Sequence, residues 1–525
     1  MKRSRLLVIC LTIISANTYG QNIHKAIEKA WPASVRMWGY DTSSKQQMSA
    51  QFSAVVVSPQ GDILTAAHTS TPGKTYKVMF PDGKVAIALA LGKIEMADDP
   101  TIPDVSMMKI ITPGTWPYAE MGYSSSLKLN QPCISIAYPE TLNQHLPGVR
   151  FGIITSLGNK RGFLQSTCAM EPGDSGGPLF DELGRVIGIH SAITISESEN
   201  FEIPVDLYRK YKTALAEAKK FNALPAVEDP IGKDQIQLQT YTPIESNTKN
   251  ACVLITSMIK GKEEKIYGTA FANAYVVSKS SMVGNEPLIN QRKASIIRRD
   301  RENDLVLLKI EAPLQDGITL TKAKPDSISF KQLGQFLVSP RLDTANAISV
   351  VGTLPFSLPR INSTGFLGAS IAIKNGPLLI TFIRKNSPAA ANDLKVGDEV
   401  ISINGITFSK AEEFGATLQK YWPNDTITIS LKREGTVYTK QIMLDEKPIP
   451  TPGHHPAEMF AGGKSYRRDG FTRLFAHDAI LTPSQCGGPV FDAAGNFMGI
   501  NIARFSRTST LVIPSEVVWA FINIH

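Results

Sequence analysis

Short apolar runs separated by turn residues dominate the chain from Ala33 to Ala192. Seven of these runs have the length and the apolar, often β-branched composition of strands: Ser53–Val57, Ile63–Thr65, Tyr76–Phe80, Val105–Ile110, Cys133–Ala137, Phe151–Ser156 and Val186–Ala192. Segments containing Gly, Pro or Asp, at 59–62, 81–83 and 182–184, provide turns between them. Many short strands without intervening helices predict an antiparallel barrel or sandwich.

A helical pattern replaces the strand pattern at residues 205–221. This segment contains no Gly or Pro, and apolar side chains recur at helical spacing at Leu207, Tyr211, Leu215 and Ala218. We therefore expect a helix at the end of the first strand-rich region. Residues 223–249, which carry Pro and Asp, predict a linker.

An internal repeat follows the linker. Three later segments match three segments of the first region: Cys486–Asp492 matches Ser175–Asp181, Gly495–Ile500 matches Gly184–Ile189, and Asp304–Ile310 matches Asp104–Ile110. Such self-similarity indicates that a folding unit has been duplicated. We therefore expect a second strand-rich unit between about Asn250 and His525.

Length and charge narrow the possibilities further. A chain of 525 residues predicts about three or four domains. Lys2, Arg3 and Arg5 precede the apolar run Leu6–Ser15, which is the layout of a secretory signal peptide and is too short to span a bilayer. We expect an exported protein, periplasmic or secreted, without a stable membrane anchor. The net charge is +8, but the basic residues form no stripe with interleaved aromatic residues. This argues against nucleic-acid binding.

Four cysteines remain beyond the expected signal peptide: Cys133, Cys168, Cys252 and Cys486. Their spacing fits no zinc pattern, and we expect neither a metal nor a cofactor. Cys133 and Cys168 both lie on predicted strands of the same region, and an oxidising compartment permits a disulfide between them. The sequence does not decide between the bonded and the free pair.

The candidate chemistry centres on Gly173-Asp-Ser175-Gly-Gly-Pro178. Flanking glycines allow a sharp turn that exposes the Ser175 hydroxyl and points the amides of Gly173 and Ser175 at one spot, as an oxyanion hole requires. A serine needs a base and an orienting carboxylate. His68 ends the run from Ile63, and Asp104 opens a later strand. The order His, Asp, Ser is one of the known chain orders of this triad.

With these residues in this order, the chain resembles the trypsin-fold serine proteases. The resemblance implies two six-stranded barrels that meet at a cleft, with His68 and Asp104 on the first and Ser175 on the second. It also implies a substrate pocket formed by Ala169, His190, Ser191 and Ala192, although His190 is expected to be structural rather than catalytic. Ala169 occupies the position where trypsin-like enzymes carry an acid, so basic P1 side chains are expected to bind poorly.

An insertion in the second unit resembles a PDZ domain. Gly365–Ala369 is similar to the carboxylate-binding loop of that family, and Leu394–Gly405 matches its HtrA-type pattern, which narrows the resemblance to the bacterial HtrA/Deg proteases. Main-chain amides of the loop would hold a peptide carboxylate and the following strand would pair with the peptide. The expected groove residues are Phe366, Leu367, Gly368, Ala369, Ile371, Phe414 and Leu418. For Phe414 alone, simple packing in the hydrophobic core is also expected.

The second unit departs from the family where the chemistry takes place. Ser281 stands in place of the histidine, Cys486 replaces the serine, and Ser484-Gln485 replaces the Gly-Asp of the oxyanion turn. A cysteine nucleophile still needs a base, and His477, nine residues upstream on a predicted strand, is a poor substitute. We expect a degenerate unit used for architecture or binding.

These observations predict a mostly β fold with two tandem trypsin-like double barrels, the second interrupted by an α+β PDZ domain. The expected boundaries are 1–20 for the signal peptide, 21–222 for the active domain, 223–249 for the linker, 364–446 for the PDZ domain, and 250–363 with 447–525 for the degenerate domain. The leading hypothesis is a serine endopeptidase acting on unfolded polypeptides, with PDZ capture of peptide C-termini and, by resemblance, homo-oligomer formation. The alternatives are a catalytically silent scaffold or chaperone and, more remotely, an esterase.

Overall fold

The computed structural model describes residues 23–95, 103–238, 240–241, 251–272, 274–311, 314, 317–319, 328–373, 376–448, 453 and 455–523. The expected signal peptide and most of the second half of the expected linker lie outside the described residues. Two compact units form: unit 1 comprises Met1–Phe356, Gly453–Ser465 and Arg473–His525, and unit 2 comprises Ser357–Pro452 and Tyr466–Thr472. None of the described helices has the length and apolar character needed to cross a membrane.

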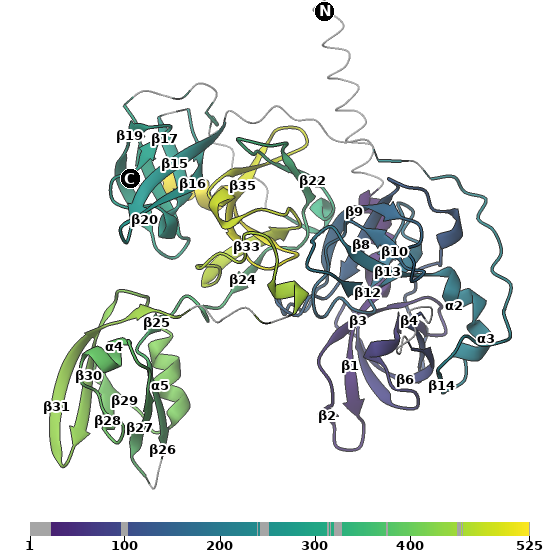
Figure 1. Ribbon diagram of the computed structural model, residues 1–525, viewed down its shortest axis with the longest axis horizontal. Helices are drawn as coiled ribbons and strands as arrows, with labels where there is room; N and C mark the ends of the chain where they lie inside the picture. Colours follow the sequence, from purple (N-terminus) through teal and green to yellow (C-terminus); the bar gives the residue numbers. More distant parts are fainter. Residues whose placement is uncertain are drawn as a thin grey trace, which may run out of the picture. The chain divides into compact units, whose positions relative to one another are not determined.

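Two antiparallel barrels begin unit 1 (Figure 1). The strands of the first are β1 (Ser34–Asp41), β3 (Phe52–Val56), β4 (Asp62–Ala66), β5 (Thr75–Met79), β6 (Val85–Ile94) and β7 (Val105–Ile110), and β2 (Gln46–Gln47) extends β1. The second is closed by β8 (Pro132–Ala137), β9 (Gly148–Ser156), β10 (Leu164–Ser166), β11 (Pro178–Phe180), β12 (Val186–Ile193) and β13 (Asn200–Pro204). All seven predicted strands are present, and the mostly β fold is confirmed.

The expected single helix over 205–221 is wrong. The structure has two short helices, α2 (Asp206–Lys210) and α3 (Lys212–Leu215), followed by strand β14 (Lys220–Phe221). Tyr211 interrupts the helical backbone with φ −117° and ψ 24°. The chain must turn here because β14 pairs in parallel with the end of β6, and this tertiary pairing overrides the local helical pattern.

A second pair of sheets in unit 1 repeats the strand order of the first pair. One sheet contains β15 (Cys252–Ile259), β16 (Lys262–Ala270), β17 (Tyr275–Lys279), β18 (Leu288–Ile289), β19 (Arg292–Lys293), β20 (Ser295–Asp300) and β21 (Leu305–Lys309). The other contains β22 (Phe336–Ser339), β23 (Ala347–Val350), β24 (Phe356–Leu358), β33 (Phe471–His477), β34 (Pro489–Asp492), β35 (Phe497–Arg504) and β36 (Thr510–Pro514), and α6 (Ser515–Asn523) follows.

The match between the two pairs is topological as well as sequential. The order β23-β22-β34-β35-β36-β33 repeats the order β9-β8-β11-β12-β13-β10 of the closed barrel, position for position. Short runs of identical sequence therefore correspond to equivalent strands, as a duplicated folding unit requires.

One hydrophobic core joins the two pairs of sheets within unit 1. Residues 23–30 are helical, and Ile23 and Ile27 approach Gly334 so closely that a Cβ on this glycine would lie 2.3 Å from Ile27 Cδ1. The rings of Phe151 and Phe336 meet edge to face with centroids 5.0 Å apart. Such close packing fixes the two pairs against each other.

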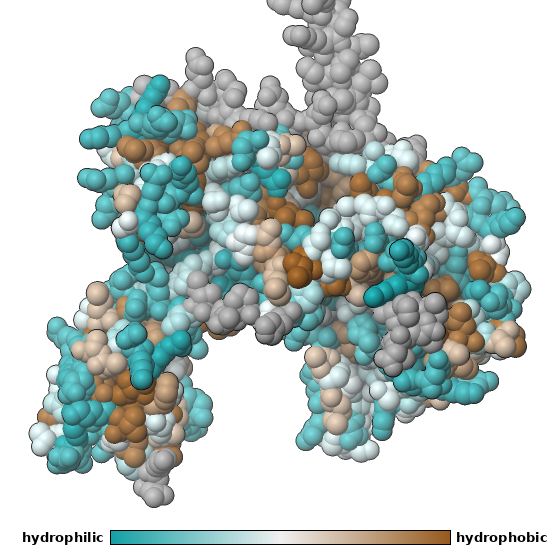
Figure 2. All heavy atoms as spheres, in the orientation of Figure 1, coloured by the Kyte–Doolittle hydropathy of each residue, from teal (hydrophilic) through white to brown (hydrophobic). Residues whose placement is uncertain are grey.

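Unit 2 has the expected PDZ topology. Its strands are β25 (Gly365–Phe366), β26 (Ala369–Ile373), β27 (Leu378–Ile383), β28 (Glu399–Ile403), β29 (Ile406–Thr407), β30 (Thr426–Arg433), β31 (Thr436–Met443) and β32 (Asp445–Glu446), with helices α4 (Pro388–Ala391) and α5 (Ala411–Leu418). Tyr466–Thr472 joins this unit because the Asp469 carboxylate accepts hydrogen bonds from the amides of Asn362 and Ser363. Figure 2 shows apolar atoms on its surface where Figure 1 labels β27, β29 and α5.

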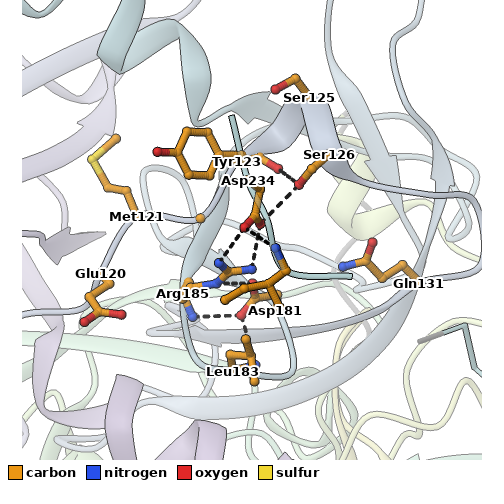
Figure 3. Close-up of polar contacts among 12 residues, drawn as sticks. Glu120, Met121, Tyr123, Ser125, Ser126, Gln131, Asp181, Leu183, Arg185 and Asp234 are labelled. Carbon is orange, nitrogen blue, oxygen red and sulfur yellow. Dashed lines mark hydrogen bonds and ion pairs between the residues drawn. The ribbon is translucent and has the colours of Figure 1, made fainter. Parts of the chain in front are cut away.

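The described part of the linker is held against the first pair of barrels. Asp234 points at Arg185 and Ser126 (Figure 3), and its Oδ2 accepts a hydrogen bond of 3.0 Å from Arg185 Nη2. Arg185 also pairs with Asp181 at 2.8 Å, so two carboxylates share one guanidinium. The Asp234 side chain is only 4% exposed. Burial works against its charge, but the bonds from the Ile236 amide and Arg185 prevail and keep the pKa of Asp234 below its ordinary value.

Asp234→Ala is expected to lower the free energy of unfolding of unit 1 by about 1–3 kcal/mol, because it removes a charged partner from a buried network. It should also speed proteolytic cleavage between residues 222 and 239. Glu228→Ala, which removes an ion pair whose carboxylate is 55% exposed, is the matched control and should change stability by less than about 1 kcal/mol. Thermal melts and limited proteolysis measure both; equal behaviour of the two variants contradicts the anchoring role.

Candidate active site

The buried carboxylate of Asp104 organises the candidate site. It lies just before β7, 3% exposed, and His68 follows β4 in the turn Ala67–Thr69. The imidazole donates from Nδ1 to Asp104 Oδ2 at 2.6 Å, and the His68 amide donates to Oδ1 at 2.9 Å. Ser191 Oγ, from β12 of the other barrel, donates to Oδ2 at 2.7 Å. Two barrels thus contribute donors to one carboxylate.

This arrangement fixes the protonation behaviour of His68. Removal from water disfavours the imidazolium, but the hydrogen bond and the negative charge of Asp104 outweigh it, so the pKa of His68 is raised above its ordinary value of 6.5. Because Nδ1 carries the proton donated to Asp104, the neutral ring leaves Nε2 free to accept one. A base of this kind needs pH above its pKa to work.

Ser175 lies in a turn whose backbone conformation requires glycine at positions 173 and 176. Gly173 and Gly176 have φ of +97° and +79°. A Cβ on Gly173 would lie 2.5 Å from the Tyr138 oxygen, and one on Gly176 would lie 2.1 Å from Thr65 Oγ1. These approaches are closer than real contacts allow, so the turn depends on glycine at both positions.

The amides of Gly173 and Ser175 donate no hydrogen bond to any part of the chain that the structure describes. The neighbouring Asp174 amide, by contrast, donates to the Glu171 oxygen. Asp174 itself points inward and forms a bidentate pair with Arg150, with distances of 2.8 and 2.9 Å, at 0% and 3% exposure. This buried ion pair stabilises the turn, because removing either side chain would leave the charge of the other buried and uncompensated.

An open pocket of about 530 Å³ contains the candidate residues. His68, Gly173, Ser175, Ser191 and Ala192 all line it. No hydrogen bond joins the His68 ring to the Ser175 hydroxyl among the described residues, although both face this pocket. Catalytic hydrogen bonds often tighten only when substrate binds.

Two of the four expected pocket residues do not line it. Ala169 is 4% exposed and lies beneath the wall that Met170 and Glu171 form. His190 is fully buried, its Nε2 hydrogen-bonds with Ser135 Oγ at 2.7 Å, and burial lowers its pKa to about 3. Side chains alternate along β12, so Ser191 faces the cleft while His190 faces the barrel interior. His190 is therefore a neutral core residue.

Several lining residues were not expected from the sequence. The pocket wall includes Gln51, Met170 and Ile193 from the first pair of barrels and, from far along the chain, His455 and Pro456. Met170 and Ile193 are the sequence neighbours of the expected pocket residues Ala169 and Ala192. Extending the expected pocket by one residue at each of these places would have found them. His455 lies 280 residues after Ser175, and no sequence pattern connects the two.

The equivalent site of the second pair keeps the carboxylate but not the base. Asp304 accepts hydrogen bonds from the Ser281 amide at 2.7 Å and from Ser281 Oγ at 2.8 Å, in the manner of Asp104 and His68. Lys279 Nζ donates to Asp304 Oδ2 at 2.8 Å and to the Ile502 oxygen at 2.8 Å, and its side chain is 1% exposed. A buried ammonium has taken the place of the imidazole as partner of the carboxylate.

Cys486 has neither the exposure nor the surroundings of a nucleophile. Its side chain is fully buried, and burial raises the pKa of the thiol. A 3₁₀ turn at Pro483–Gln485 directs the Cys486 amide to the Pro483 oxygen at 3.3 Å, whereas the equivalent Ser175 amide has no such partner. His477 donates from Nε2 to Asn501 and accepts from the Ala479 amide at Nδ1, and burial lowers its pKa to about 4.

The expected peptide groove of unit 2 is built partly from core residues. Phe414 is 3% exposed and packs edge to face on Phe408, and Leu367 is 2% exposed. Phe366, Ala369, Ile371 and Leu418 are partly exposed. Gly368 has φ +79°, and a Cβ on it would lie 2.2 Å from Ser387 Cβ. The amides of Leu367 and Gly368 have no acceptor among the described residues.

Cys133 and Cys168 are free thiols in the structure, with their sulfur atoms 3.9 Å apart and both side chains buried. A disulfide bond is about 2.05 Å long. Among the described residues, no group of three or more His, Cys, Asp or Glu side chains is arranged to hold a metal ion.

Comparison with known proteins agrees with this geometry. Residues 52–189 match the trypsin-like peptidase domain, and residues 365–444 match the PDZ domain. The putative serine protease HhoA of Synechocystis sp. is 30% identical over 184 residues, which are 33% of this chain and 44% of the relative. A probable periplasmic serine endoprotease, DegP-like, of Pseudomonas savastanoi pv. phaseolicola is 29% identical over 196 residues, 35% of this chain and 39% of the relative.

The chain thus spans less than half the length of these relatives. Among solved structures, the serine endoprotease from Yersinia pestis matches 81% of this chain and 97% of its own, with 16% identity and a TM-score of 0.31. The matched domains define a trypsin-fold protein with a PDZ domain. The relatives that the chain resembles are HtrA- and DegP-like serine proteases.

Side-chain NMR of the histidines tests the site without reference to activity. In the Ser175→Ala full chain, His68 should titrate with a pKa above 6.5, whereas His477 should titrate only at about 4 and His190 at about 3. Asp104→Asn removes the charge that favours the imidazolium, so the pKa of His68 should fall. A His68 pKa that does not respond to Asp104→Asn would contradict the pairing.

Proposed function

We propose that this protein is an exported serine endopeptidase that hydrolyses peptide bonds of unfolded or damaged proteins. The observation that carries the proposal is the convergence of His68, Ser175 and two unpartnered amides on one open pocket. The periplasmic names of the DegP-like relatives support export. The two unoccupied donors favour hydrolysis over a silent scaffold, because such a scaffold has no need of an oxyanion site.

In the proposed reaction His68 Nε2 takes the proton of Ser175 Oγ as the oxygen attacks the substrate carbonyl. The amides of Gly173 and Ser175 stabilise the negative charge on the carbonyl oxygen. Asp104, fixed by Ser191, holds the tautomer and stabilises the imidazolium. The proton then passes to the leaving amine, and water hydrolyses the acyl-enzyme by the same steps in reverse.

The apolar side chains Met170 and Ile193 in the pocket wall favour small aliphatic P1 residues. The second pair of sheets takes no part in the chemistry, since Cys486 is buried and its amide is occupied.

Hydrolysis of casein should depend on Ser175 and not on Cys486. Ser175→Ala is expected to lose at least about 10⁴-fold in rate, and Cys486→Ala should stay within about threefold of the wild-type rate. Covalent labelling by a fluorophosphonate should follow the same pattern. Wild type and Ser175→Ala that are equally inert in both assays would favour the silent peptide-binding scaffold instead.

Unit 2 is proposed to bind peptide C-termini through the unpartnered amides of Leu367 and Gly368, with the peptide pairing along β26. Using the Ser175→Ala full chain, a peptide with an apolar residue before a free carboxylate should bind at least about tenfold more tightly than its amidated form. Equal affinity for the two peptides, measured by fluorescence anisotropy, contradicts carboxylate recognition.

A further inference from the structure

Two arginines of the second pair of sheets are buried next to the candidate active site. Arg504 and Arg507 are both 0% exposed. Arg504 ends β35 and Arg507 lies in the turn that leads to β36; we term residues 504–509 the arginine hairpin. A guanidinium removed from water needs charged or carbonyl partners, because an unpaired buried charge is strongly unfavourable. Arg504 donates to the oxygens of Ala479 and Arg507 within the second pair of sheets, and the other three acceptors of the two arginines come from the first pair of barrels.

The first set of partners lies in the loop between β12 and β13, residues 194–199, which we term the pocket loop. Arg504 Nη2 donates to Glu197 Oε1 at 2.5 Å. Arg507 donates to the oxygens of Ile195 at 3.2 Å and Ser196 at 2.5 Å. The pocket loop directly follows the stretch 191–193, whose three residues line the pocket. The arginine hairpin therefore fixes the position of the loop that continues this pocket wall.

A second partner belongs to the other wall of the pocket. Glu171 lines the pocket, two residues before Gly173, and is 4% exposed. Burial raises the pKa of Glu171. Burial also lowers the pKa of Arg504 and Arg507, and the negative charges of Glu197 and Glu171 act against that lowering. Of the two carboxyls, Glu197 forms the ion pair with Arg504, and removing either partner would leave the other charge buried without a counter-charge.

The arginine hairpin also holds the return segment, residues 455–465, by which the chain re-enters unit 1. The Ser465 amide donates to the Arg504 oxygen at 2.8 Å, and the Arg504 amide donates to Ser465 Oγ at 2.9 Å. The Arg504 guanidinium lies over the Phe460 ring, 5.2 Å from its centroid. At the start of this segment, His455 and Pro456 line the active-site pocket.

We propose that Arg504 and Arg507 are positioning residues that set the shape and selectivity of the substrate pocket of the first pair of barrels. The second pair of sheets, which has no usable nucleophile of its own, completes the pocket in cis by holding two segments of its wall: the pocket loop, which continues residues 191–193, and the return segment. The kinetic test of this inference rests on the proposed peptidase function. The second test, by hydrogen exchange, rests on the structure alone.

The kinetic test uses the full chain with Arg504→Met or Arg507→Met and, as matched control, Arg473→Met, which removes an arginine that is 45% exposed on the same pair of sheets. For peptides with a small P1 residue, kcat/KM should fall roughly 10- to 100-fold, because small displacements of pocket walls are costly. The ratio of kcat/KM for peptides with a small P1 residue to kcat/KM for peptides with a large P1 residue should decrease. Labelling of Ser175 by a small fluorophosphonate, which needs little of the pocket, should change by less than about threefold.

The second test is hydrogen exchange, which needs no activity. Exchange over residues 192–199 should speed up in both hairpin variants and stay unchanged in Arg473→Met, while exchange in β1 stays unchanged in all three. If Arg504→Met fails to fold, Glu197→Gln provides the same comparison, because it neutralises the partner and keeps its shape. It should narrow P1 preference in the same direction.

Unchanged P1 preference together with unchanged exchange at 192–199 in folded variants overturns the proposal. A uniform loss of labelling and cleavage at constant P1 preference also overturns it, because that pattern indicates general destabilisation. If wild type neither cleaves peptides nor reacts with fluorophosphonate, the proposed function fails. The exchange comparison then still decides whether the arginine hairpin holds the pocket loop.

Discussion

The candidate active site and the cleft around it depend on the Asp104 carboxylate. It is buried between two barrels and accepts the Nδ1–H and the amide of His68 from one and the Ser191 hydroxyl from the other. A buried carboxylate is tolerated only when its oxygens are satisfied, so each donor has a fixed place. The imidazole orientation, the cleft between the barrels and the direction in which β12 leaves the site all follow from this requirement.

The duplicated pair of sheets shows which parts of that arrangement are structural and which are chemical. Asp304 keeps the same two kinds of bond from Ser281, so the carboxylate serves the fold even without a histidine. What the second pair lacks is the exposed turn: its glycine before the nucleophile is replaced, a 3₁₀ turn forms, and the Cys486 amide is used internally. An oxyanion site needs backbone amides that have no acceptor within the protein. Among the described residues, the amides of Gly173 and Ser175 have none.

Much of this could be predicted from the sequence because the determinants are local. Seven strands of the two barrels follow from short apolar runs and turn residues, and the turn around Ser175 follows from glycines at positions with positive φ. The expectation failed where neighbours distant in sequence decide the outcome. The helix over 205–221 breaks at Tyr211 because β14 must pair with β6, and His190 turns inward because β12 alternates between cleft and core.

The sequence by itself determined the double-barrel fold, its duplication, the inserted PDZ domain and the identity of the candidate triad, since each is encoded in contiguous patterns of a few residues. Only the tertiary structure decided which side chains share the pocket. His455, Glu197 and Arg504 lie in separate parts of the chain and meet because buried guanidiniums require counter-charges and because the two pairs of sheets share one core. Such pairings depend on distances in space, which a linear pattern does not contain.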